Sequence, residues 1–188
     1  KNQEKIIIIS TDEVYGSTDS TCNESSPLQP SNPYSASKAG SDLIAQSFFK
    51  SFKLPITILR PNNIYGPSQH IEKIIPATIN AASGNGRLSI HGNGEVYRHY
   101  LHVLDLCDSI KLILNKFKSG EIYNVNGTSK IKIIDLINLI ADIKGKKTSD
   151  FSDFVEDRPF NDFIYKINGD KIRNLGWNEK KEFQKELE

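Results

Sequence analysis

The chain opens with an apolar run that ends in a polar cluster. Residues 6–9 are four isoleucines, and the segment STDEVYG, residues 10–16, follows at once. Consecutive β-branched apolar residues are typical of a strand buried on both faces, the position that strands take in parallel sheets. The run therefore predicts a central parallel strand with hydroxyl and carboxyl groups at its carboxyl end.

A long helix and a second strand follow this cluster. Asn32 and Pro33 supply a cap residue and a first-turn proline, and residues 34–52 contain no further proline and repeat apolar residues at helical spacing. Residues 55–59, PITIL, have the composition of another buried strand. Residues 6–59 therefore predict one βαβ unit, whose right-handed crossover brings both strand ends to the ligand-binding edge of an open α/β sheet.

Beyond residue 68 the pattern changes to shorter elements. We expect helices at residues 71–82, 103–117 and 133–143, strands at 88–92 and 121–125, and a loop-rich last part with a short helix near its end. The predicted fold class is therefore α/β: the carboxy-terminal part of a doubly wound, parallel, Rossmann-type sheet together with a smaller α/β substrate-binding lobe.

Composition narrows the possible partners and setting. The chain has 188 residues with a formal net charge of +1, which gives no basis for a nucleic-acid partner. Cys22 and Cys107 are far apart and suggest no disulfide framework. No apolar run approaches the roughly 20 residues that a membrane span needs. We expect a cytoplasmic protein with no nucleic-acid and no membrane partner.

Two polar motifs carry candidate chemistry. Tyr34 and Lys38 lie one helical turn apart, and an ammonium close to a phenol lowers the phenol's pKa by about 1 to 3 units. Asp12 and Glu13 are adjacent acids at the end of the first strand. Each motif has a structural alternative, a solvated helix-surface pair and a solvated turn. Their convergence on one sheet edge favours a catalytic interpretation.

These motifs resemble a known enzyme family. Together with residues 60–67, RPNNIYGP, they resemble the extended short-chain dehydrogenase/reductase superfamily, and the adjacent acids in STDEVYG resemble its NDP-glucose 4,6-dehydratases. The resemblance implies NAD as the cofactor and a nucleotide sugar as the substrate. It also implies that residues 1–68 belong to the NAD-binding domain, and that residues 69–188 form mainly the substrate lobe with some segments returning to the first domain.

The resemblance assigns a role to each catalytic candidate. Tyr34 would take the proton of the sugar 4-hydroxyl as hydride passes from C4 to NAD, and Lys38 would lower the pKa of Tyr34 and hold the nicotinamide ribose. Glu13 would remove the C5 proton, Asp12 would protonate the departing 6-hydroxyl, and Thr11 would bond the 4-hydroxyl. Two carboxyl groups with opposite proton duties need unequal pKa values.

The resemblance also assigns ligand contacts. The main chain at Ile64 would meet the nicotinamide end of the cofactor. The implied substrate contacts are Thr11, Asn63, Lys73, Ile74, Ser89, Ile90, His91, Arg98, Asn124, Asp157, Arg158 and Asn161. Taken singly, such residues are most often solvated cations or turn and cap residues, so only the ordered set carries weight.

Two details bear on the substrate and on metals. His91 and residues 158–162, RPFND, resemble the UDP-glucose 4,6-dehydratases of UDP-rhamnose synthesis, so UDP-glucose is expected ahead of dTDP-glucose. His99, His102 and Asp105 lack a recognised ligand spacing, and we expect no metal site.

One expected part of a dinucleotide site is missing from the sequence. No turn with closely spaced glycines follows a strand and opens a helix, as pyrophosphate binding requires. We therefore expect a carboxy-terminal portion of a longer enzyme, inactive alone, which the resemblance implies is a homodimer at full length. The open alternatives are an epimerase or decarboxylase of the same superfamily, or a non-catalytic nucleotide-sugar binding lobe.

Overall fold

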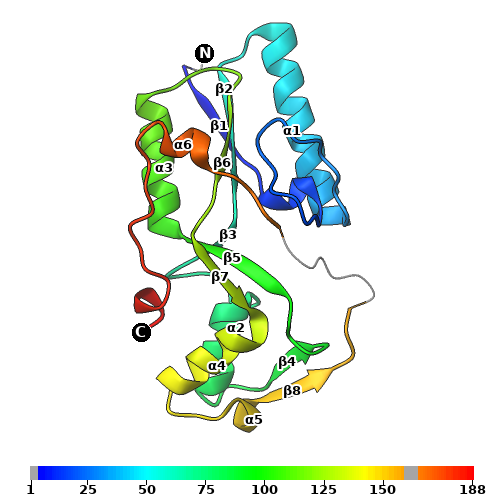
Figure 1. Ribbon diagram of the computed structural model, residues 1–188, viewed down its shortest axis with the longest axis vertical. Helices are drawn as coiled ribbons and strands as arrows, with labels where there is room; N and C mark the ends of the chain where they lie inside the picture. The colour runs from blue at the N-terminus through cyan, green and yellow to red at the C-terminus, as the bar shows by residue number, and fades with distance from the viewer. Residues whose placement is uncertain (1–3, 159–164) are drawn as a thin grey trace.

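The computed structural model describes residues 4–158 and 165–188, and a three-stranded parallel sheet lies at the centre of its upper part in Figure 1. Its strands are β1 (Ile6–Ile9), β2 (Ile56–Pro61) and β6 (Ile122–Val125), in the order β1-β2-β6. Strands β1 and β2 pair in parallel, which confirms the βαβ unit. The four isoleucines of β1 are only half-buried, unlike the prediction, because β1 has a described neighbour on one side alone, whereas β2 is fully buried between two strands.

Helices cover both faces of this sheet. Figure 1 shows α1 (Pro33–Phe52) and α3 (Val103–Asn115) on opposite sides, with α6 (Asp170–Arg173) beside α3. The α1 helix begins at the Asn32 cap, whose side chain accepts from the Ser35 N–H, and it packs Ala45 against β2. On the other face Ile113 joins the largest core cluster. This arrangement confirms a doubly wound α/β fold.

The remaining strands form two small sheets. Strand β5 (Tyr97–His102) pairs in parallel with β3 (Asn63–Tyr65) and antiparallel with β7 (Ser129–Lys132). Strand β4 (Leu88–His91) pairs in parallel with β8 (Ser152–Val155), and α2 (Ile74–Ala82), α4 (Ile133–Ile143) and α5 (Thr148–Phe151) pack against this pair. The strands expected from the sequence pattern did not include β3, β5, β7 or β8, and α2 and α3 are shorter than expected.

The sheet β1-β2-β6 with its helices is called the first body, and the two small sheets with α2, α4 and α5 are called the second body. Two later segments of the chain also lie in the first body. Residues 103–125 contribute α3 and β6, and residues 165–177 contribute α6 and Trp177 to the same core. The chain therefore passes from the first body to the second and back more than once, as Figure 1 shows.

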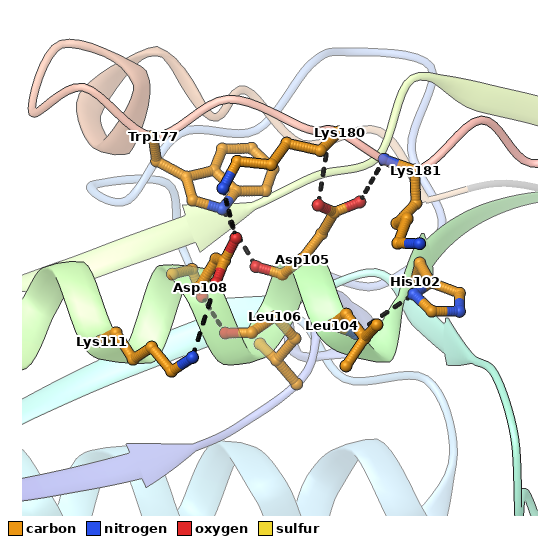
Figure 2. Close-up of polar contacts among 10 residues, drawn as sticks. His102, Leu104, Asp105, Leu106, Asp108, Lys111, Trp177, Lys180 and Lys181 are labelled. Carbon is orange, nitrogen blue, oxygen red and sulfur yellow. Dashed lines mark hydrogen bonds and ion pairs between the residues drawn. The ribbon is translucent and has the colours of Figure 1, made fainter.

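The carboxy-terminal segment is fixed to the start of α3. The Asp105 carboxylate accepts from the main-chain N–H groups of Lys180 and Lys181, each at 3.0 Å, and the Trp177 indole donates to the Asp105 carbonyl at 3.0 Å (Figure 2). Phe183 then packs on the aromatic side chains of β3 and β5, and the short helix η2 (Lys185–Leu187) follows. Among the described residues, none of the helices has the length and apolar character to cross a membrane.

Candidate active site

A cavity of about 700 Å³ opens where the carboxyl ends of β1 and β2 meet the second body; we call it the central cavity. It is bounded by the short helix η1 (Asp12–Tyr15), α1, α2, β4 and β5. The predicted site residues that line it are Thr11, Glu13, Tyr34, Asn63, Ile64, Lys73, Ile74, Ser89, Ile90, His91, Arg98 and Arg158. The structure thus brings most of the predicted set to one place from separate chain segments.

Asp12 lies just behind the wall of this cavity. Its side chain is 1% exposed, and its two carboxyl oxygens contact different neighbours. Asn62 Nδ2 donates to Asp12 Oδ2 at 2.6 Å, and Thr11 Oγ1 donates to Asp12 Oδ1 at 3.2 Å. Burial, and then the charge of Glu13, raise the pKa of Asp12 to about 7, although the two donors act in the opposite direction. Asp12 can therefore hold a proton near neutral pH.

Tyr34 faces the two acids from α1. Its side chain lines the central cavity and hydrogen-bonds Thr11. Burial raises the pKa of the Tyr34 phenol, as do the charges of Glu13 and Asp12, while the bond to Thr11 lowers it. This direction differs from the expected lowering by Lys38. The reason is that Lys38 Nζ donates to the main-chain carbonyl of Ile9 at 2.7 Å, at the end of β1.

Positive side chains gather along the part of the cavity formed by β4 and β5. Arg98 and Arg158 line the cavity together with Lys73 at the start of α2, and the imidazole of His91 lines it as well. The Arg98 guanidinium also lies 5.6 Å from the ring centre of Tyr165. Guanidinium groups match phosphate oxygens in geometry and charge, so this side of the cavity suits a diphosphate.

Some predicted residues do not reach the cavity. Asn124 is fully buried in β6: its Oδ1 accepts from the Tyr15 hydroxyl at 2.8 Å, and its amide donates to the carbonyls of Cys22 and Asn168. It is therefore part of an internal network, and its assignment to substrate stays a prediction. Asp157 does not line the cavity, and its carboxylate accepts from the Arg158 N–H at 2.8 Å. Asn161 lies outside the described residues.

Four of the cavity residues that were not predicted as site residues carry unpaired polar atoms. Ser10, Asn62, Gln69 and Tyr100 all line the cavity, and each has a buried side-chain oxygen without a hydrogen-bond partner in the described structure. Unpaired buried polar atoms are costly and are most often explained by a ligand or by function. Asn62 had a signal, since it adjoins Asn63 in the strand-end motif, whereas Tyr100 had none because β5 was not among the strands expected from the sequence.

The histidines near β5 have other partners. His102 Nδ1 accepts from the Leu104 N–H at 3.2 Å and so caps α3, while Asp105 holds the carboxy-terminal segment. Within residues 4–158 and 165–188, no three His, Cys, Asp or Glu side chains are grouped to hold a metal ion.

Comparison with known proteins finds similarity to sugar-nucleotide 4,6-dehydratases. The family model described as GDP-mannose 4,6 dehydratase matches residues 1–188. The dTDP-D-glucose 4,6-dehydratase of Mus musculus is 40% identical over 183 residues, covering 94% of this chain and 52% of that protein. A trifunctional protein of Arabidopsis thaliana that includes UDP-glucose 4,6-dehydratase is 40% identical over 180 residues, covering 94% of this chain and 27% of that protein.

A solved structure is also close. DesIV, a dTDP-glucose 4,6-dehydratase from Streptomyces venezuelae crystallised with NAD and TYD, superposes with a TM-score of 0.93 at 39% identity. The match covers 97% of this chain and 57% of that one. The chain spans about half the length of the dTDP-D-glucose 4,6-dehydratases that it matches.

Proposed function

The chain belongs to the GDP-mannose 4,6 dehydratase family, and we propose that the whole protein is an NAD-dependent NDP-glucose 4,6-dehydratase. One observation carries the proposal: Thr11, Glu13 and Tyr34 meet at one cavity, with the carboxyl of Asp12 buried directly behind them. A hydroxyl, a phenol and two acids with different surroundings are the groups that this reaction requires.

The residues present fit the nicotinamide end of the cofactor. Tyr34 and Ile64 line the same cavity, and the unpartnered Ser10 Oγ lies at the end of β1, where this fold places a dinucleotide. We propose that the Ile64 main chain, Lys38 and Tyr34 hold that end. NAD held by these residues would supply the chemistry of a reversible hydride acceptor for the sugar carbons. The 188 residues include no glycine turn for the pyrophosphate, and we propose that alone they do not turn over substrate.

The reaction needs a starting state that the raised pKa of Asp12 favours and the raised pKa of Tyr34 opposes. The phenol must act as a base and the carboxyl as an acid, so Tyr34 begins deprotonated and Asp12 protonated. A charged Asp12 raises the pKa of Tyr34. Protonation of Asp12 removes that charge, so the neutral acid and the deprotonated phenol stabilise each other. Thr11 hydrogen-bonds the side chains of both Asp12 and Tyr34 and so fixes their positions relative to each other.

Glu13 and Asp12 then perform the two proton transfers of the water elimination. Once C4 is a ketone, the C5 proton becomes acidic, and Glu13, which faces the cavity, removes it. The bond from C6 to its hydroxyl breaks, Asp12 supplies the proton, and water leaves. Glu13 gives its proton back to C5, which completes the 4-keto-6-deoxy sugar once C6 has been reduced. Arg98 and Arg158 bind the diphosphate, with Asn63, Lys73, Ser89 and His91 completing the substrate contacts.

We propose UDP-glucose as the favoured substrate and dTDP-glucose as the next. Relatives of both kinds are 40% identical to the chain, so the discrimination rests on details of the base pocket. Uracil and thymine differ by one methyl group, worth about 1 to 3 kcal/mol in a pocket. Initial rates of 4-keto-6-deoxy product formation by the whole protein with each nucleotide glucose decide the order. We further propose that the protein is cytoplasmic and acts as a homodimer.

Substitution of Glu13 tests the reaction itself. A Glu13→Gln whole protein keeps Tyr34 and Thr11 and should still oxidise C4, so bound NADH accumulates on mixing with UDP-glucose. Loss of the general base should reduce water elimination by about 100-fold or more. Stopped-flow absorbance of NADH and product analysis measure the two steps. Glu95→Gln, which changes a half-exposed carboxylate paired with Lys132, is the matched control and should behave as the unmodified protein.

The same experiment separates the alternatives. An epimerase or decarboxylase would give no dehydrated product from either nucleotide glucose, before or after the substitution. A non-catalytic binding lobe would bind UDP or dTDP in calorimetry of the whole protein without any turnover.

A further inference from the structure

We propose that Asn62 is a positioning residue: its amide holds the carboxyl of Asp12 in the orientation from which that group can deliver a proton toward the central cavity. The inference rests on the proposed dehydratase function and assigns a role to a residue outside the predicted catalytic set. Asn62 lies at the end of β2, next to the strand end that carries Asp12.

The geometry at Asp12 is specific. Asn62 Nδ2 lies 2.6 Å from Asp12 Oδ2, and both side chains are almost completely buried, at 3% and 1% exposure. The Asn62 main-chain N–H donates to the Val125 carbonyl at 3.1 Å, which ties this residue to β6. Asn62 therefore contacts Asp12 from a fixed position in the sheet.

This contact determines which oxygen of Asp12 carries the proton. An oxygen that accepts from an amide N–H is poorly placed to hold a hydrogen of its own, so the neutral acid carries its proton on Oδ1. Asp12 Oδ1 lies 3.2 Å from Thr11 Oγ1, and Thr11 lines the cavity. Because a hydroxyl both donates and accepts, the same pair can pass the proton from Asp12 through Thr11 to the cavity. Asn62 thus directs the acid toward the side where substrate binds.

The charges around Asp12 explain why a neutral amide suits this place. Glu13 on η1 and the phenol of Tyr34 on α1 face it, and both oppose its ionisation when charged, while Arg98 on β5 favours ionisation. A second cation at residue 62 would keep Asp12 ionised, and a carboxylate there would add another negative charge. An amide donor steadies one oxygen while leaving the group able to be protonated near neutral pH.

The unpartnered Asn62 Oδ1 adds to the case. This atom is buried and has no hydrogen-bond partner among the described residues, although the residue lines the cavity. If Asn62 served only for packing, an apolar side chain of similar size would fit as well. It would also avoid the desolvation cost of the unpaired Asn62 Oδ1. The hydrogen bond that the other end of Asn62 donates to Asp12 gives this buried amide a role besides packing.

Asn62→Ala in the whole protein tests the role. Loss of a donor to the carboxylate should raise the pKa of Asp12, so the alkaline limb of the kcat profile should move up by about one pH unit. At pH 7 kcat should fall about tenfold or more, because the acid is less well oriented and weaker, while KM for UDP-glucose should stay within about twofold. Infrared difference spectra against Asp12→Asn follow protonation of the same carboxyl without turnover. Asn80→Ala removes an amide of α2 that donates to the Asn85 carbonyl and does not line the cavity, and it should leave both titrations in place.

A second variant keeps the test decisive if the alanine protein is poorly folded. Asn62→Ser retains a donor on a shorter side chain, and its alkaline limb and infrared titration should fall between those of the unmodified and alanine proteins. Alkaline limbs and carboxyl titrations that coincide in all three proteins would overturn the proposal. If the unmodified whole protein dehydrates neither nucleotide glucose, the proposed function fails, while the infrared titration still decides whether Asn62 controls Asp12.

Discussion

Asp12 has the least favourable surroundings of the acids at the cavity. Its carboxyl is 1% exposed and lies beside Glu13, and burial is the main reason that its pKa rises to about 7. In the unfolded chain the same group ionises with a pKa near 3.8. The folded protein therefore binds one more proton than the unfolded chain between these two pH values. Such a residue serves the reaction at a cost to stability.

The sign of this effect gives a stability prediction. A raised folded pKa contributes stability that is fully present below about pH 4 and is lost as pH rises through about 7. Three pKa units correspond to an upper bound of roughly 4 kcal/mol. Asp12→Asn should therefore raise the thermal midpoint of the whole protein, by more at pH 8 than at pH 5, in melts followed by circular dichroism.

A surface acid provides the control of opposite sign. The Lys180 ammonium beside Asp108 holds the pKa of that carboxyl below its usual range, so its contribution is present at neutral pH and is lost on acidification. Asp108→Asn should give no gain at pH 8. An Asp12→Asn protein with the same gain at both pH values would show that the carboxyl is not neutral below pH 7.

The residues at the cavity could be foreseen in part. The strand-end acids, the YxxxK pair and the RPNNIYGP segment were readable because each follows a strong apolar or helical pattern. The direction of the Tyr34 pKa was not readable, since Lys38 has the carbonyl of Ile9 as its partner, and one turn of helix does not reveal such a contact. The pairing of Asn62 with Asp12 depends on adjacent strands 50 residues apart in sequence.

At the scale of elements, a buried ion pair joins α1 to the sheet. Arg60 Nε on β2 lies 2.8 Å from Asp42 Oδ2 on α1, and the two side chains are 2% and 0% exposed. The guanidinium also donates to the Tyr15 hydroxyl at 2.7 Å, which in turn donates to Asn124. One network therefore links η1, α1, β2 and β6, the four elements that surround the end of β1.

Breaking this network should be costly. Asp42→Ala leaves the Arg60 charge buried and unpaired, which should lower the free energy of unfolding by about 3 to 5 kcal/mol in urea titration of the whole protein. The double variant Asp42→Leu with Arg60→Met buries no charge and should recover much of that loss. Glu182→Ala, which removes an exposed pair with Lys185, should cost less than about 1 kcal/mol. A loss as small for Asp42→Ala would contradict the role of the pair.

The elements were predicted unevenly, for physical reasons. The first strand, α1 and β2 carry long uniform patterns, and the βαβ unit that they imply is confirmed. Strands β7 and β8 are four residues each and half-exposed or exposed, so neither shows a buried run nor a clear alternation. Their pairing with β5 and β4 comes from the tertiary fold, which short local patterns do not encode.

At the scale of the whole molecule, both bodies contribute residues to the central cavity. The first body supplies Thr11, Glu13 and Tyr34, and the second supplies Lys73 and Arg98 from α2 and β5. Phe183 of the carboxy-terminal segment packs against Tyr65 and Tyr100, and Tyr100 also lines the cavity. Asp105 holds this segment by its main-chain N–H groups (Figure 2), and Phe183 of the segment packs behind the cavity residue Tyr100.

The outer face of α1 carries exposed apolar side chains, which is relevant to the proposed homodimer. Leu43, Ile44, Phe48 and Phe52 are 44% to 70% exposed, and the last three recur every four residues along one side of the helix. Large apolar side chains gathered on one helix face are typical of a protein contact surface. This face supports the proposed homodimer, in which α1 of one subunit packs against α1 of the other.

Charge placed on that face should disrupt the assembly. Ile44→Glu and Phe48→Glu put carboxylates where the proposed contact buries apolar surface, so light scattering of the whole protein should show a shift from dimer to monomer at micromolar concentration. Leu114→Glu changes a partly exposed leucine of α3 and should leave the dimer intact. Because Tyr34 and Lys38 lie on the same helix, a monomeric variant should also lose activity if packing of α1 steadies the catalytic pair. Variants that stay dimeric would place the subunit contact elsewhere, and a monomer with full activity would separate assembly from catalysis.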